Sequence, residues 1–159
     1  MNNLAEAYQA VILSPFGPVG IHLEEGRLSG IEYLDQEVEA YRSETPGLNR
    51  VVQQIEAYLD DPKSNFELEM QLAGTPFQRQ VWRELQAIPA GKTLTYGELA
   101  ARIGSGARAV GNACRANPCP LVVPCHRVVA RQGLGGFAGE TSGIKLEIKR
   151  WLLHHEGWL

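Results

Sequence analysis

Residues 95–129 read TYGELAARIGSGARAVGNACRANPCPLVVPCHRVV, and this stretch predicts two short helices joined by a tight turn. Thr95 and Glu98 have the spacing of a capping box, in which each side chain satisfies a backbone amide at a helix start. The first helix is expected to end at Gly104, and a Gly-Ser-Gly turn leads into a second helix over residues 107–116. Two short helices across a three-residue glycine turn are typical of a helix-turn-helix.

The segments on either side of this pair predict further helices. Thr75 is a good N-cap, and Pro76 suits the first helical position because its missing N–H costs nothing there. A Pro-Ala-Gly sequence from Pro89 ends that helix. Near the C-terminus, apolar and aromatic residues at helical spacing predict a last helix whose packed face carries Ile144, Ile148, Trp151, Leu152 and His155.

The first half of the chain reads differently. Apolar runs at 8–13, 19–23 and 28–33 are separated by turn residues and predict two antiparallel hairpins. Apolar residues recur at helical spacing over 48–59, and alternation over 66–72 predicts a half-buried strand.

The Ala-Gly-Thr-Pro sequence at 73–76 marks the expected domain junction. We therefore expect a two-domain α/β protein, with a small α/β domain over 1–73 and a mostly helical domain over 74–159. At 159 residues, the chain has room for one ordinary domain or two small ones.

The composition is that of a soluble protein, with 44% hydrophobic and 21% charged residues. No apolar run approaches the ~18 residues that a membrane span needs, and the N-terminus lacks the basic and apolar regions of a signal peptide. We expect a cytoplasmic protein with no membrane partner.

Charge is distributed unevenly. Residues 1–73 carry 4 Lys/Arg against 13 Asp/Glu, a net charge of −9, whereas residues 74–159 carry 11 against 5, a net charge of +6. Such asymmetry suggests an anionic partner, such as nucleic acid, for the basic half. The alternative is chance drift of surface charge between two domains.

Three cysteines, Cys114, Cys119 and Cys125, fall within twelve residues. An odd, crowded set disfavours a disulfide scaffold and makes thiol chemistry feasible. Four zinc ligands are available in number if His126 is added, but the spacing contains no C-x2-C pair. The first half offers only His22 as a strong ligand, so we predict no metal site.

Cys125 is the candidate nucleophile because it stands beside His126 and Arg127, and a thiol reacts as the thiolate. Neighbouring residues of an extended segment point to opposite sides, so a bridging water is the expected link to His126. Glu156 is one candidate for a carboxylate that orients the histidine. The competing interpretation is that Cys125 is a small buried hydrophobe, the commoner fate of a lone cysteine.

Residues 75–159 resemble the O6-alkylguanine-DNA alkyltransferases over essentially their whole length. The order and spacing of five motifs carry the resemblance: TYGELA at 95–100, RAVG at 108–111, NP at 117–118, PCHRV at 124–128 and WLLHHEG at 151–157. The first half is similar only in its strand-rich pattern. The family fold implies a ribonuclease-H-like N-terminal domain and a winged-helix-like C-terminal domain.

The resemblance implies that Cys125 is the nucleophile and permanent alkyl acceptor. His126 would take its proton through a water, and Glu156 would orient His126. The substrate would be O6-alkylguanine in DNA, and O4-alkylthymine stays open as a second substrate. Tyr96 would donate a hydrogen bond to guanine N3 and stabilise the guanine anion that leaves.

The resemblance also implies a DNA interface. The base would be flipped from the duplex, and Arg108 would fill the gap in the stack. The second helix would enter the minor groove through the small residues Ala107, Ala109 and Gly111, which suits a protein that scans any sequence.

The guanine edge would be held by backbone groups of Cys125 and Val128, with Asn117 shaping the segment. Ala138 stands where many family members have a serine, so backbone N–H groups near it would contact O6. The resemblance implies that the protein needs no cofactor. It also implies a monomer in which each chain accepts a single alkyl group.

Three other interpretations account for parts of this pattern. An alkyltransferase-like binding protein lacks the cysteine, so Cys125 disfavours it. A helix-turn-helix regulator would bind one defined sequence, and a cysteine hydrolase would turn over many times. Competition by random duplex DNA distinguishes a regulator, which prefers one sequence, from a repair protein, which prefers one lesion. Reaction stoichiometry distinguishes a hydrolase from a protein that reacts once. Preferred alkyl size and cooperativity on DNA are left open, as are the roles of Cys114 and Cys119.

Overall fold

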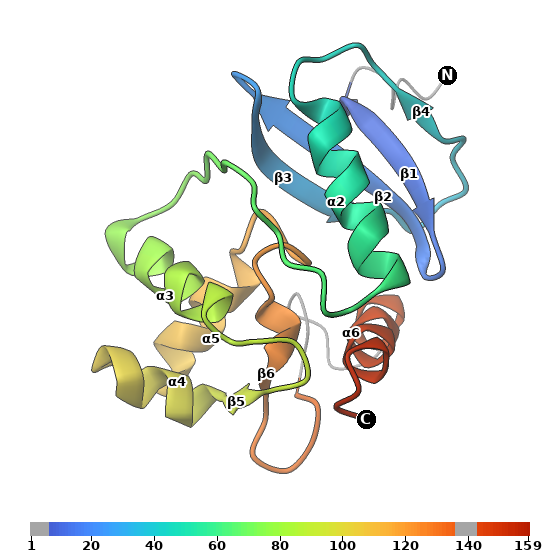
Figure 1. The fold of residues 1–159 in the computed structure, drawn as a ribbon. Helices are drawn as coiled ribbons and strands as arrows, with labels where there is room; N and C mark the ends of the chain where they lie inside the picture. The colour runs from blue at the N-terminus through green and yellow to red at the C-terminus, as the bar shows by residue number, and fades with distance from the viewer. Residues whose placement is uncertain (1–6, 136–142) are drawn as a thin grey trace. The chain divides into compact units, whose positions relative to one another are not determined.

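The computed structural model describes residues 7–135 and 143–159, and the chain divides into two compact units, 1–73 and 74–159 (Figure 1). The protein is of mixed α/β type. Over the described ranges, no helix is both long enough and apolar enough to cross a membrane.

The first unit contains a four-stranded antiparallel sheet in the order β3-β2-β1-β4. The two hairpins expected from the sequence are confirmed. The short outer strand β4 was not predicted, because two residues carry too little pattern. The strands are β1 (Ala10–Ser14), β2 (Gly17–Glu24), β3 (Arg27–Tyr33) and β4 (Tyr41–Arg42).

Helix α2 (Leu48–Asp60) lies along one face of this sheet (Figure 1). Its apolar residues return every three or four positions, which places them on one side of the helix. Each fully buried aliphatic side chain contributes roughly 1.5–3 kcal/mol to the free energy of folding, so the apolar side of this helix stabilises the unit. The buried residues of the helix are Leu48, Val51, Val52, Ile55 and Tyr58.

The prediction of a strand over 66–72 was wrong. Only Met70 pairs with the sheet, through an isolated parallel bridge to Leu28. The backbone of Glu67 is satisfied by side chains of α2 instead: its carbonyl accepts from Arg50 at 3.0 Å, and its N–H donates to Gln54 at 2.7 Å. Because those groups are occupied, the sheet ladder does not extend along this segment.

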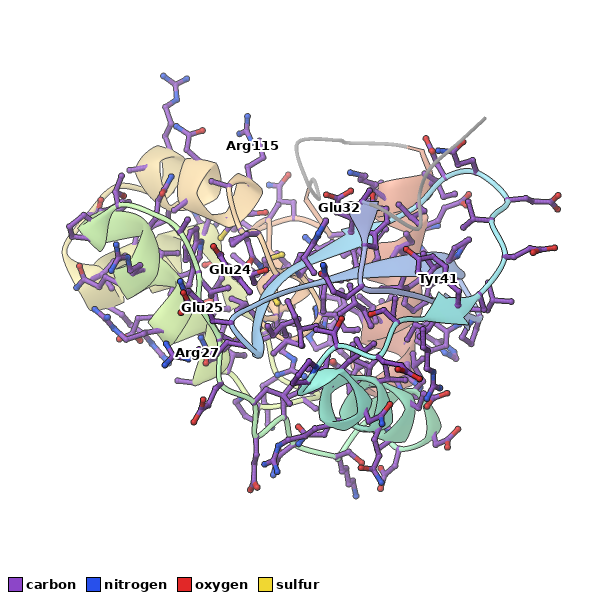
Figure 2. The ribbon with its side chains drawn as sticks, turned by 90° about the horizontal axis from the view of Figure 1, so that it is seen from above. Glu24, Glu25, Arg27, Glu32, Tyr41 and Arg115 are labelled. Atoms are coloured by element: carbon purple, nitrogen blue, oxygen red, sulfur yellow. The ribbon has the colours of Figure 1, made fainter. Side chains whose placement is uncertain are left out.

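Acidic side chains gather at the turn between β2 and β3. Figure 2 shows Glu24, Glu25 and Arg27 there. Arg27 lies 3.8 Å from Glu69, and both side chains are largely exposed. Such an exposed pair contributes little to stability.

The second unit combines helices with a two-stranded parallel sheet. The elements are α3 (Pro76–Gln86), β5 (Leu94–Thr95), α4 (Tyr96–Ile103), α5 (Ala107–Arg115), the 3-10 helix η1 (Cys125–Arg127), β6 (Val128–Val129) and α6 (Ile144–His155).

The predicted caps and helix pair are confirmed. Thr95 N donates to Glu98 at 2.9 Å and Glu98 N donates to Thr95 Oγ1 at 3.1 Å, which completes the capping box of α4. Thr75 caps α3 in the same way with Gln78. Gly104 ends α4 in the left-handed region, at φ +69°, where glycine bears no steric penalty.

The packed face of α6 differs from the predicted one. The buried residues are Ile148, Lys149, Leu152 and Leu153, whereas Ile144 is 44% exposed. Trp151 and His155 are half-buried and stack on each other, with ring centroids 4.7 Å apart. Helix α6 is thus rotated about its axis relative to the predicted orientation, and this rotation places the side chain of Lys149 in the interior of the second unit.

Trp82 links α3 to the second helix of the pair. Its indole N–H donates to the Ala113 carbonyl at 2.9 Å, and the ring is buried. We expect Trp82→Phe to lower the free energy of unfolding by about 1–3 kcal/mol, because that buried carbonyl near the end of α5 loses its donor. Urea unfolding measures the change. The matched variant Trp158→Phe is expected to change stability by less than about 0.5 kcal/mol; equal losses in both would contradict this role.

Candidate active site

Cys125 opens the 3-10 helix η1, directly before β6, and is 7% exposed. The expectation that this segment is extended was wrong. Arg127 N donates to the Pro124 carbonyl at 3.0 Å, and Val128 N donates to the Cys125 carbonyl, which winds the chain into a tight turn. Within the described ranges, no hydrogen bond joins Cys125 to the side chain of His126.

His126 and Glu156 meet across 30 residues of sequence. His126 Nε2 lies 2.8 Å from Glu156 Oε2, and both side chains are fully buried. The sequence named this carboxylate as a candidate, and the structure places it against the histidine. Glu156 occupies the C-cap position of α6, so the end of that helix delivers it to η1.

Arg127 completes a three-residue network that sequence reasoning missed. Its Nε donates to Glu156 Oε1 at 2.9 Å and its Nη2 donates to Oε2 at 2.8 Å, a two-pronged pairing. The third guanidinium nitrogen, Nη1, donates to the Ile88 carbonyl just beyond α3 at 2.6 Å. One arginine thus fixes η1, the end of α3 and the end of α6.

This network sets two protonation states. Burial raises the pKa of Glu156, but hydrogen bonds from His126 and Arg127 outweigh burial and hold that pKa well below its usual range. Burial lowers the pKa of His126, although the bond to Glu156 raises it. A neutral His126 therefore faces an ionised carboxylate at neutral pH.

The tautomer of His126 follows from its partner. A carboxylate only accepts hydrogen bonds, so Nε2 carries the hydrogen and Nδ1 keeps its lone pair. Nδ1 is buried and has no hydrogen-bond partner among the described protein atoms. The geometry leaves Nδ1 as the basic atom of the ring.

Asn117 shapes the segment that leads to Cys125. Its Nδ2 donates to the Val123 carbonyl at 2.9 Å, and its Oδ1 accepts from Cys119 N at 2.9 Å. Burial raises the pKa of Cys125 to about 11, while a side-chain hydrogen bond from Asn117 and the charge of Lys149 lower it. The resting cysteine is a thiol that requires a base for ionisation.

Tyr96 is the first residue of α4 and is half-buried. Burial, and then the thiols of Cys114 and Cys125, raise the pKa of its phenol to about 12, so it remains a hydrogen-bond donor at neutral pH. Two glycines flank the ring: a Cβ built on Gly111 would lie 4.0 Å from it, and one on Gly135 would lie 3.4 Å from it. Gly111 thus borders the tyrosine as well as the helix surface.

The first turn of α5 is open to solvent. Ala107, Arg108 and Ala109 are exposed, and Arg115 is exposed at the last turn, where it extends away from the helix (Figure 2). Val128 is buried, and its carbonyl accepts from Lys149 Nζ at 2.8 Å. The structure therefore separates an exposed basic helix face from a buried thiol site.

Ala138, expected near the pocket, lies outside the described residues. Cys114 and Cys119 are free and buried, and burial raises the pKa of both thiols, that of Cys114 to about 12. The described ranges contain no group of three or more His, Cys, Asp or Glu side chains suited to a metal ion.

Lys149 was also missed by sequence reasoning. The sequence contained a sign of its burial, because Lys149 directly follows Ile148, a residue of the predicted packed face of the last helix. Helical spacing alone did not show how far α6 is rotated toward η1.

The comparisons with known proteins fit this arrangement. The family model described as "6-O-methylguanine DNA methyltransferase, DNA binding domain" matches residues 76–158. The second unit, with its helix pair and buried cysteine, is a domain of this class.

Relatives match nearly the whole chain. A methylated-DNA–protein-cysteine methyltransferase of Salmonella typhimurium is 40% identical and covers 93% of this chain and 94% of its own. A constitutive one of Bacillus subtilis is 37% identical, with 94% of each chain covered. The chain belongs to the family of methylated-DNA–protein-cysteine methyltransferases.

Solved structures agree. Mycobacterium tuberculosis O6-methylguanine methyltransferase has a TM-score of 0.77 and 38% identity, covering 92% of this chain and 90% of that one. Mycobacterium tuberculosis OGT in complex with DNA has a TM-score of 0.76 at the same identity and coverage.

Proposed function

We propose that this protein repairs DNA by transferring the alkyl group of O6-alkylguanine to its own Cys125. The observation that carries the proposal is the fully buried pair, at 2.8 Å, of Glu156 at the end of α6 and His126, which follows Cys125 in the turn η1. Membership of a family named for transfer from methylated DNA to a protein cysteine supports the substrate.

The residues account for each proton and bond. Cys125 loses its thiol proton to Nδ1 of His126 through a bridging water, and Glu156 stabilises the imidazolium that forms. The sulfur then attacks the alkyl carbon, a C–S bond forms and the C–O6 bond breaks. The bonding electrons leave on guanine, and Tyr96 donates a hydrogen bond to N3 to stabilise that anion. The anion then takes up a proton from water, and the imidazolium of His126 returns its proton to water, so that neutral guanine and neutral His126 result.

The reaction needs no cofactor, and the thioether product has no easy route back to the thiol. We therefore expect one turnover per chain. A cysteine hydrolase would regenerate its thiol, and a non-reactive binding protein would gain no mass.

The experiment is mass spectrometry after the protein is mixed with excess duplex that contains one O6-methylguanine. One added methyl per chain, mapped to the peptide bearing Cys125, is expected. A duplex with unmodified guanine is the control. Methyl release with repeated turnover would contradict the proposal, as would tight lesion binding with no mass change.

DNA binding is assigned to α5 and the basic second unit. The exposed small residues Ala107 and Ala109 permit close approach to the walls of a minor groove, with Gly111 further along the helix. The target base is flipped out, and Arg108 occupies its place in the stack.

We expect Arg108→Ala to slow repair of duplex DNA by about 10- to 100-fold, because unstacking a base costs a few kcal/mol that the side chain offsets. Reaction with free O6-benzylguanine, which needs no flipping, is expected to change less than about threefold. Arg83→Ala, which removes an exposed positive charge from α3, controls for general electrostatics. Equal losses on both substrates would refute the proposed role of Arg108.

We assign the two units as an N-terminal ribonuclease-H-like domain, 1–73, and a C-terminal winged-helix-like DNA-binding and alkyltransferase domain, 74–159. A twisted antiparallel sheet with a helix on one face supports the first assignment. A helix-turn-helix beside a short two-stranded sheet supports the second. The protein acts as a monomer, since one chain carries all the proposed reacting groups.

A further inference from the structure

Asn112 is an exposed residue of α5 whose side chain the fold does not use. Among the described residues, its amide has no hydrogen-bond partner, whereas its backbone carbonyl accepts from Ala116 N at 3.1 Å, as in any helix. Asparagine is a weak helix former, because its side chain competes for backbone groups in non-helical conformations. In a helix of nine residues, this asparagine therefore costs stability without a compensating contact within the protein.

The buried side of α5 fixes the direction in which Asn112 faces. The residues that pack into the unit are Val110, Ala113 and Cys114. Each residue of an α-helix advances about 100° around the axis, so Arg108, Asn112 and Arg115 fall within an arc of about 60° on the opposite side. All three are exposed, and Figure 2 shows Arg115 extending away from the helix. These three residues form a polar ridge along the centre of the exposed face.

Small residues border the polar ridge on both sides. Ala109 and Ala116 lie on one side of it, and Ala107 and Gly111 lie on the other. The minor groove of B-DNA is about 6 Å wide, whereas a helix with its side chains is about 10 Å across, so only a narrow ridge reaches the base edges. The polar ridge has that shape, because its neighbours leave room for the groove walls.

The residues of the polar ridge differ in chemistry. Arg108 and Arg115 are cations, and α5 contains no acidic residue, so the ridge attracts phosphates. Asn112 is neutral and adds nothing to that attraction. Its amide carries two N–H donors and one carbonyl acceptor, which are groups that read base edges in the minor groove.

The spacing along the polar ridge places Asn112 near the lesion. Four residues of helix rise about 6 Å, which is less than two base-pair steps of about 3.4 Å. With Arg108 in the gap left by the flipped nucleotide, the amide of Asn112 lies opposite a base pair one or two steps away.

We propose that Asn112 is a specificity-determining residue for repair, whose amide donates a minor-groove hydrogen bond to a base pair one or two steps from the lesion. The inference rests on the proposed function, because it requires α5 in the groove and Arg108 in the stack. Adenine N3 and thymine O2 accept this bond, whereas guanine places an amino group on the same groove floor and blocks the approach. A·T pairs are therefore favoured at that position.

Two substitutions test the amide. Asn112→Ala removes it and introduces a better helix former, so the fold is retained. Asn112→Gln keeps the amide on a longer side chain. Gln80→Ala, which removes an exposed amide from α3, is the matched control. Circular dichroism and thermal unfolding check each variant, and the thermal midpoint of Asn112→Ala is expected to equal or exceed that of wild type.

The first readout is binding to two unmodified duplexes, measured by fluorescence anisotropy at one salt concentration. One duplex contains only A·T pairs, and in the other every adenine is replaced by diaminopurine, which adds the minor-groove amino group of guanine and still pairs with thymine. We expect wild type to bind the A·T duplex about 2- to 10-fold more tightly, the range of one hydrogen bond, and Asn112→Ala to bind both within about twofold. The ratio for Asn112→Gln is expected to lie between these, and Gln80→Ala keeps the wild-type ratio.

The second readout is the rate of methyl transfer from a duplex with one O6-methylguanine, in which only the two base pairs on each side of the lesion contain adenine or diaminopurine. We expect wild type to show the same preference in this rate and Asn112→Ala to lose it. Free O6-benzylguanine has no groove and measures the thiol site alone. A rate loss there as large as on duplex would overturn the inference, because it would place the effect of Asn112 at Cys125.

An equal binding ratio in wild type and Asn112→Ala would also overturn the inference, as would the same loss in Gln80→Ala. A lower thermal midpoint in both Asn112 variants would assign the residue to stability instead. Binding to unmodified duplex requires no alkyl transfer, so the two proposals fail separately. If wild type shows the preference but takes no methyl group from DNA, the proposed function fails and the groove contact stands. If it takes the methyl group and the ratio is unchanged in Asn112→Ala, only the inference fails.

Discussion

Cys125→Ala is expected to abolish alkyl transfer completely while leaving affinity for O6-methylguanine duplex within about threefold of wild type. The sulfur is the only atom lost that forms the new bond, and alanine is smaller than cysteine, so the guanine base of the proposed flipped nucleotide is still expected to fit. In the proposed complex, binding energy comes from the exposed face of α5 and from phosphate contacts, which the substitution leaves intact.

Mass spectrometry measures transfer, and gel shift with labelled duplex measures binding. Cys119→Ala is the control: its thiol is fully buried, and burial raises its pKa, so it is expected to lose some stability and still accept one methyl per chain. If Cys125→Ala still accepted a methyl group, the mechanism would be contradicted, and Cys114 would become the candidate alkyl acceptor.

Glu156→Gln is expected to produce the largest combined loss of rate and stability. The amide accepts through one oxygen only, so it cannot serve His126 and both nitrogens of Arg127 together. His126 loses the carboxylate that orients it, and we expect the single-turnover rate to fall by about 10²- to 10⁴-fold. Stopped-flow reaction with free O6-benzylguanine measures this.

The stability cost follows from the buried charges. Removing one partner of a buried ion pair leaves the other uncompensated, which costs about 3–5 kcal/mol. Glu156→Gln is therefore expected to lower the free energy of unfolding by that amount at pH 7, measured with urea. Glu147→Gln, at an exposed position of the same helix, is expected to cost less than about 0.5 kcal/mol.

The pH dependence has a definite sign. The folded pKa of Glu156 lies below its unfolded value of about 4.3, so its stabilisation is present above that value and is lost as pH falls toward the folded pKa. The gap between wild type and Glu156→Gln is expected to be constant from about pH 6 to 7 and to narrow below about pH 4. A gap that is constant down to pH 3 would show that the carboxylate charge is not what stabilises the fold.

Local chemistry made the helix pair predictable. The capping box of Thr95 and Glu98 spans four residues, and the left-handed turn at Gly104 depends on one, so both signals lie within a single turn of chain. The same holds for Thr75 and Pro76 at the start of α3. The two hairpins were equally predictable from the sequence, because apolar runs separated by short turns indicate which strands pair.

Tertiary contacts decided the remainder. The segment 66–72 alternates like a strand, yet α2 takes the backbone groups of Glu67 with the side chains of Arg50 and Gln54. Propensity describes a residue's own preference and does not include competition from a helix elsewhere in the unit.

The capped helix-turn-helix and the two hairpins follow from the sequence without tertiary contacts, as does the position of Cys125 next to His126, since each depends on residues close together in the chain. Only the packed structure decided that Arg127 reaches both Glu156 and the Ile88 carbonyl, and that Lys149 is buried against Val128. Those contacts join residues 21 to 39 positions apart, and they depend on how α6 is rotated as it packs, which the free energy of the whole unit sets and no single segment encodes.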